Sequence, residues 1–149
     1  MFTKTHLLIG LFVAIYFLPY SNNKLIFFPI VLIASLIPDI DTVFFSKKNY
    51  KLLKPLKSES YKNFMHSYTI CIILAVLLAF YYPVFAFPFF LGYSFHLFFD
   101  SLTVMGTNPF WPFKVKSRGP IVPGGKIEKT INVILVFLCI FLAFKYFFL

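Results

Sequence analysis

Histidine and aspartate residues occur at the edges of long apolar segments in this chain, where ionisable side chains are costly. All three histidines and three of the five acidic residues take such positions: His6, Asp39, Asp41, His66, His96 and Asp100. A charged group near the centre of a membrane segment costs roughly 2.5–3.5 kcal/mol on insertion scales, so such groups suggest a functional site. Imidazole and carboxylate together are ligands that a borderline or hard divalent metal ion prefers. The residue types therefore predict a metal site.

The spacing of these residues adds to this interpretation. His96 and Asp100 are four positions apart in a predicted helix, so they share one face and can approach one ion or one phosphate. The alternative is a simple hydrogen bond at a helix end. Asp39 and Asp41 follow Pro38, where helical hydrogen bonding is disturbed, so their carboxylates can converge on an unwound turn. The alternative there is a helix end with solvated aspartates.

The elements that carry these residues are apolar runs in a very hydrophobic chain. Of the 149 residues, 60% are hydrophobic and 13% are charged. Continuous apolar runs of membrane-spanning length recur, which excludes an ordinary soluble globule. They also disfavour a β-barrel, whose strands alternate apolar and polar residues. We expect one domain over residues 1–149, an all-α transmembrane bundle of about five helices. The expected ranges are about Thr5–Leu18, Leu25–Phe45 with an interruption at Pro38, Phe64–Tyr82, Val84–Leu102 and Thr130–Phe148.

The basic residues predict the orientation of the bundle. Most lysines and the single arginine lie in two connections, residues 46–63 and 103–129, whereas the connections on the opposite side hold only Lys24. The positive-inside rule places both basic connections and the N-terminus in the cytoplasm, and the C-terminus outside. Topology and anionic headgroups explain the net charge of +9, so nucleic acid is not expected as a partner. All six His and Asp residues then fall at the cytoplasmic ends of four helices, where antiparallel packing would gather them.

The same residues form ordered motifs that resemble the YdjM-type inner-membrane proteins. The motifs are Thr5-His6-x-x-x-Gly10, Leu36-Ile37-Pro38-Asp39-Ile40-Asp41, Met65-His66-Ser67 and Gly92-x-x-x-His96-x-x-x-Asp100-x-x-Thr103-x-x-Gly106. They cover the chain from Thr5 to about Pro112, and Gly124-Gly125-x-x-Glu128 is a weaker downstream block. The family is described as membrane-bound metal-dependent hydrolases. The pattern is also similar, more remotely, to zinc-dependent phospholipase C and its nuclease relatives, which implies phosphoester chemistry on clustered metal ions.

One departure from the family's pattern bears on activity. The family often carries His-Arg-Gly ahead of a Thr-His-Ser block, whereas this chain has Tyr61-Lys62-Asn63, and Met65 replaces the Thr. One candidate ligand and one candidate phosphate-binding arginine are thereby absent. The number of metal ions and the catalytic competence of the site are both open at this point.

These observations predict a membrane-bound hydrolase that cleaves a phosphoester of a lipid or lipid-linked substrate at the cytoplasmic face. We expect one or two divalent ions, Zn²⁺ or similar, bound by the six His and Asp residues. Asp41 is also a candidate general base, or a partner that orients an imidazole. Arg118 is a candidate phosphate-binding residue, the alternative being a topology-setting charge. Glu128 is a helix-start carboxylate or, less simply, a further ligand.

Two competing interpretations come from other functional classes. The first is a membrane protein that binds metal without catalysis, and the second is a metal or proton transporter. Transporters place their sites near the membrane midplane, with polar residues leading to them from both sides. Here the side opposite the predicted site offers Ser21, Asn22 and Asn23 and almost nothing charged, which disfavours a transporter.

Overall fold

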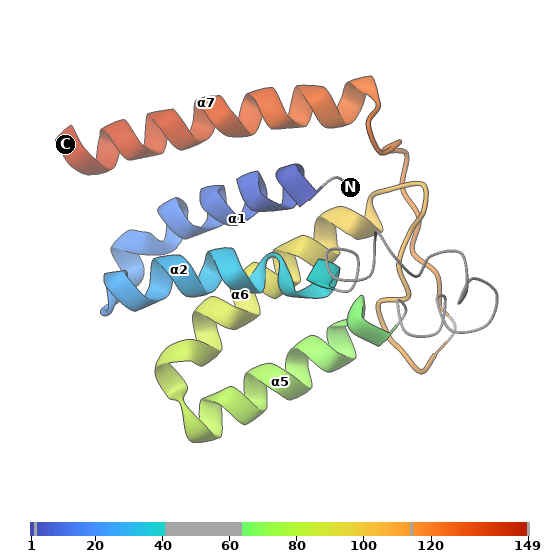
Figure 1. Ribbon diagram of the computed structural model, residues 1–149, viewed down its shortest axis with the longest axis horizontal. Helices are drawn as coiled ribbons and strands as arrows, with labels where there is room; N and C mark the ends of the chain where they lie inside the picture. The colour runs from blue at the N-terminus through green and yellow to red at the C-terminus, as the bar shows by residue number, and fades with distance from the viewer. Residues whose placement is uncertain (2, 41–63, 114, 149) are drawn as a thin grey trace, which may run out of the picture.

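Five helices make up the described part of the chain, which comprises residues 1, 3–40, 64–113 and 115–148 of the computed structural model, and these residues contain no β-strand. The helices are α1 (Thr3–Phe17), α2 (Lys24–Ala34), α5 (Tyr68–Tyr81), α6 (Pro83–Ser101) and α7 (Lys126–Phe148). Helix α1 packs against α2, α6 and α7, and α6 packs against α1, α2 and α5 (Figure 1). The predicted all-α bundle of about five helices is confirmed.

Three described helical segments are long and apolar enough to cross a membrane. They are Thr3–Tyr20, which joins α1 to the 3₁₀ turn Leu18–Tyr20, together with Pro83–Ser101 and Lys126–Tyr146. Helix α5 has 14 residues and α2 has 11, and both are shorter than the roughly 20 residues that a crossing helix needs. Among the described residues, α1 with its following turn, α6 and α7 are therefore the elements long enough to span a membrane.

Three of the predicted helix boundaries differ from the structure, while the predicted interruption at Pro38 is confirmed. Helix α2 ends at Ala34 and is followed by a separate 3₁₀ turn, Ile37–Asp39, because Pro38 has no N–H to continue the helical ladder. Residues 41–45 of that predicted helix lie outside the described residues. Helix α5 begins only at Tyr68, because the extended backbone of Ser67 caps it. Helix α7 begins at Lys126, ahead of the predicted Thr130.

Two glycines let neighbouring helices approach α2 closely. A Cβ at Gly10 of α1 would overlap Ser35 Oγ, and a Cβ at Gly92 of α6 would overlap the carbonyl oxygen of Val31. The end of α2 is therefore held between α1 and α6. His6 lies one helical turn before Gly10, and His96 lies one turn after Gly92, so both imidazoles face the turn that follows α2.

The connection from α6 to α7 lies beyond the helix ends, on the same side as the N-terminus (Figure 1). It is held together by two isolated bridges, one parallel between Thr103 and Ile121 and one antiparallel between Thr107 and Ser117. This end of the bundle is where the predicted site residues meet.

Candidate metal centre

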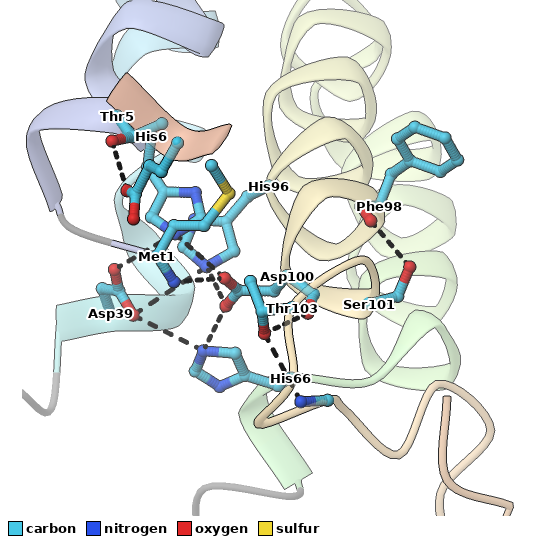
Figure 2. Close-up of polar contacts among 12 residues, drawn as sticks. Met1, Thr5, His6, Asp39, His66, His96, Phe98, Asp100, Ser101 and Thr103 are labelled. Carbon is cyan, nitrogen blue, oxygen red and sulfur yellow. Dashed lines mark hydrogen bonds and ion pairs between the residues drawn. The ribbon is translucent and has the colours of Figure 1, made fainter. Parts of the chain in front are cut away.

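Five of the six predicted site residues lie together at one end of the bundle. His6 comes from α1, Asp39 from the 3₁₀ turn after α2, and His66 from the turn before α5, while His96 and Asp100 lie near the end of α6. All five are buried, with exposed fractions of 8% or less. Figure 2 shows the two carboxylates facing each other, with His66 on one side and His96 and His6 on the other. Segments distant in sequence thus form one cluster.

Of the two clustered carboxylates, Asp100 lies closer to the three imidazoles. Its Oδ1 lies 3.1 Å from His6 Nε2. Its Oδ2 lies 3.4 Å from His66 Nε2 and 3.3 Å from His96 Nε2. The amino group of Met1 also donates to Asp100 Oδ1 at 2.9 Å. Both oxygens of this carboxylate therefore lie next to groups that carry a positive charge or can take one up.

Asp39 completes the cluster from the opposite side. Its Oδ1 lies 3.5 Å from His66 Nε2 and 3.9 Å from His96 Nε2, and its Oδ2 lies 3.9 Å from His6 Nε2. Burial acts to raise the pKa of Asp39, but the hydrogen bond with His66 and the nearby imidazoles of His96 and His6 lower it below its usual 3.8. Asp39 is therefore an anion at neutral pH, as a metal ligand must be.

His66 lies between the two carboxylates. Burial lowers its pKa, but hydrogen bonds with Asp100 and Asp39 outweigh burial and raise the pKa from the usual 6.5 to about 9. A metal ion binds only the neutral imidazole, so metal binding has to displace the proton that His66 holds in the metal-free protein. The negative charges of Asp39 and Asp100 stabilise a proton on His66, and they would equally stabilise a metal ion bound beside it.

His96 is oriented by the chain beyond the end of α2. Its Nδ1 lies 2.7 Å from the carbonyl oxygen of Ser35, which can only accept a hydrogen bond, so Nδ1 carries the proton. The other nitrogen, Nε2, is then left with its lone pair pointing at the two carboxylates. A second nitrogen that donates to a carbonyl is the usual way in which proteins orient a metal-binding histidine.

Contacts made by Tyr93 and by Ser67 hold the turn that carries His66. Tyr93 of α6 donates its hydroxyl to the carbonyl oxygen of Met65 at 2.6 Å. Ser67 Oγ accepts from the backbone N–H of Thr69 at 3.1 Å, and it also lies 3.2 Å from both Trp111 N and Pro109 O. His66 is therefore fixed by the residues on either side of it, which contact α6 and the connection after α6.

His6 stacks on His96, with ring centroids 3.7 Å apart and an interplanar angle of 18°. Its Nδ1 and Nε2, and Nε2 of His96, are buried without a hydrogen-bond partner among the described residues. His6 Nε2 is close to Asp100 Oδ1 but is not in line for a hydrogen bond. Buried unpaired nitrogens are destabilising unless something else satisfies them.

A divalent metal ion fits this arrangement. One ligand atom from each of Asp39, His66, His96 and Asp100 lies within 4.8 Å of every other. Ligands bound at about 2.0–2.2 Å around a tetrahedral ion are about 3.4 Å apart. The distances from Asp100 Oδ2 to the His66 and His96 nitrogens, 3.4 and 3.3 Å, match that separation. The unpaired Nε2 of His96 supplies the lone pair that such an ion needs.

The other residues singled out from the sequence lie either outside the described residues or outside the cluster. Asp41 lies outside the described residues, as do Tyr61, Lys62 and Asn63. Arg118 is exposed in the connection between α6 and α7 and takes no part in the cluster of described residues. Glu128 is buried in the first turn of α7, where it accepts hydrogen bonds from Thr5 Oγ1 at 2.6 Å and Gly124 N at 2.7 Å.

Two orienting groups were missed by the sequence prediction. The carbonyl oxygen of Ser35 has no sequence signal, because every residue carries one. Tyr93 had a weak signal, since it lies three positions before His96 on the same face of α6.

The sequence was compared with known proteins. Residues 1–149 match the family model described as YdjM inner membrane protein. No curated protein and no solved structure matches the chain.

Proposed function

The chain belongs to the YdjM inner membrane protein family, and from that premise we propose that it is a metal-dependent hydrolase that acts on a phosphoester of a lipid or lipid-linked substrate. The observation that carries the proposal is the buried cluster of Asp39, His66, His96 and Asp100, whose ligand atoms lie within 4.8 Å of one another. Such a cluster is costly in a membrane protein unless it is used.

The residues of the cluster divide into two roles in the proposed reaction. Asp39, His66, His96 and Asp100 would hold the ion, and the two carboxylates would balance its charge. A divalent ion such as Zn²⁺ supplies a Lewis acid there, which activates water and stabilises charge that develops on a phosphoryl oxygen. His6 lies against His96 and within 3.1 Å of Asp100, so it is placed to bind the same ion, a second ion or the substrate.

The surroundings of the cluster favour a substrate with an apolar tail and an anionic head. Exposed apolar side chains lie in the connection that follows α6, among them Met105 at 72% and Phe113 at 71% exposure. The same connection carries the basic residues Lys116 and Arg118, which are exposed. Aromatic and basic side chains together are typical of the membrane–water interface. A lipid headgroup at that interface would lie beside the metal centre.

The proposal predicts chelator-sensitive turnover. Metal-loaded protein in mixed micelles is expected to release phosphate or a phosphorylated head group, and a chelator should stop the release until divalent metal is added back. Asp39→Asn keeps the shape of the side chain but removes its charge. Because loss of a group that only orients a ligand costs about 10–100-fold in activity, turnover should fall at least about 100-fold. Ser101→Ala, which changes a side chain that bonds only to Phe98 O of its own helix, is the control and should keep full turnover.

Two results would contradict the enzymatic proposal. Turnover that survives in Asp39→Asn would assign the activity to other residues or to a contaminant. A metal-loaded protein without turnover on a broad panel of lipids would favour the metal-binding scaffold.

We also propose that the metal centre faces the cytoplasm, with the N-terminus inside and the C-terminus outside. The basis is the concentration of basic residues in residues 46–63 and 103–129. A cysteine that replaces Lys116 should be labelled by an impermeant thiol reagent only after the cells are opened, in a protein without Cys71 and Cys139. A cysteine at Asn22, the matched position between α1 and α2, should be labelled in intact cells. The opposite pattern would overturn the orientation.

A further inference from the structure

A half-open groove lies at the end of the bundle opposite the metal centre. It has a volume of about 450 Å³ and is bordered by the end of α1, the start of α2 and the end of α7. Its apolar lining includes Ile15, Leu18, Phe28 and Ala143. Figure 1 shows these three helix ends gathered beside the C-terminus, far along the bundle from the N-terminus. The groove therefore takes no part in the metal centre.

Among the described residues that line the groove, Lys24 carries the only charged side chain. Its ammonium lies 5.2 Å from the centroid of the Tyr146 ring, a cation–π distance, which holds the charge at the groove. None of the described residues that line the groove is acidic. Lys24 thus brings a positive charge to an apolar groove without a carboxylate from the lining to neutralise it.

The position of Lys24 is also unusual for membrane topology. It is the one basic residue in the connections on the side predicted to face outward, where the positive-inside rule disfavours lysine. An anionic ligand at the groove would neutralise this charge.

We propose that the groove binds one anionic phospholipid, with an acyl chain between α1, α2 and α7 and its phosphate at Lys24. The volume of about 450 Å³ lies within the range of about 300–1,000 Å³ typical of small-molecule sites. Apolar walls match the chain, and the ammonium matches the phosphate. The lipid would join the ends of α2 and α7 across α1, since α1 packs against both.

Native mass spectrometry of the protein in mild detergent tests this assignment. With phosphatidylglycerol, the wild type should show a one-to-one adduct that survives delipidation, about fivefold more abundant than the adduct with phosphatidylcholine of the same chains. Lys24→Gln should remove that preference. Lys145→Gln is the matched control, because Lys145 is exposed near the same end of α7 but does not line the groove, and its preference should equal that of the wild type.

A second variant tests the acyl-chain part of the site. Ala143→Trp fills the groove and should lose the adduct with either lipid, while an unfolding temperature equal to that of the wild type without added lipid shows that the bundle has kept its fold. Absence of a wild-type adduct, or equal binding of the two lipids in the wild type, would overturn the proposal. So would a phosphatidylglycerol preference that persists in Lys24→Gln. Asp100→Asn should bind the lipid normally, so failure here is separate from failure of the hydrolase proposal.

Discussion

Asp100→Asn is expected to lose nearly all bound metal. Among the described carboxylates, Asp100 alone lies within 3.1–3.4 Å of all three imidazoles, and the substitution removes its charge while keeping its size. Loss of a group that merely orients a ligand costs about 10–100-fold in metal affinity, so loss of a ligand should cost at least that much. The measurement is the metal-to-protein ratio by elemental analysis after equilibration with a competing chelator.

Lys4→Ala is the control for this substitution. Lys4 is exposed near the start of α1, close in sequence to His6, and its loss should leave the metal content unchanged. Because an ion that binds only the folded state stabilises it by mass action, Asp100→Asn should also remove the rise in unfolding temperature on metal addition. A wild-type metal ratio in Asp100→Asn would show that this carboxylate is not a ligand.

Gly92→Leu is expected to lower both stability and metal affinity. A Cβ at this position would already overlap the carbonyl oxygen of Val31 and lie 2.9 Å from Ala34 Cβ, so a larger side chain must push α6 away from α2. Overpacking of this kind typically costs about 1–3 kcal/mol, and a clash with backbone belongs at the upper end. The displacement would also separate His96, one turn along α6, from the Ser35 carbonyl that orients it.

Thermal unfolding in detergent, with and without metal, measures both effects. Ala79→Leu places the same side chain at an exposed position on α5 and should change neither the unfolding temperature nor the metal affinity. If Gly92→Leu unfolds at the wild-type temperature and retains its metal, the close approach of α2 and α6 does not position the centre.

Two independent patterns in the sequence predicted that five side chains gather at one end of the bundle. They are His6, Asp39, His66, His96 and Asp100. Hydropathy sets the directions of the helices, and the lysine distribution assigns their ends to a membrane face, and neither pattern depends on these five residues. The family resemblance likewise rested on ordered motifs and is matched by the family model over the whole chain.

The helix boundaries and orienting contacts could not be predicted in the same way. The start of α5 depends on Ser67 adopting an extended backbone, which Pro109 and Trp111 support through contacts with Ser67 and Tyr68 from 42 and 44 residues away in the sequence. The proton position on His96 depends on a backbone carbonyl that comes close only when α2 meets α6. Interactions of this kind arise from tertiary packing and leave no periodic pattern in the sequence.

The five clustered side chains come from four separate parts of the chain, between positions 6 and 100, and none comes from α7. An ion bound to them would therefore act as a cross-link that closes a very long loop. Bringing such distant segments together costs loop-closure entropy, which rises with loop length, and the binding free energy of the ion offsets that cost. During synthesis, the set of five is complete once Asp100 has emerged, before α7 exists. Metal capture could then fix the arrangement of α1, α2 and α6 first, leaving α7 to join by packing against α1.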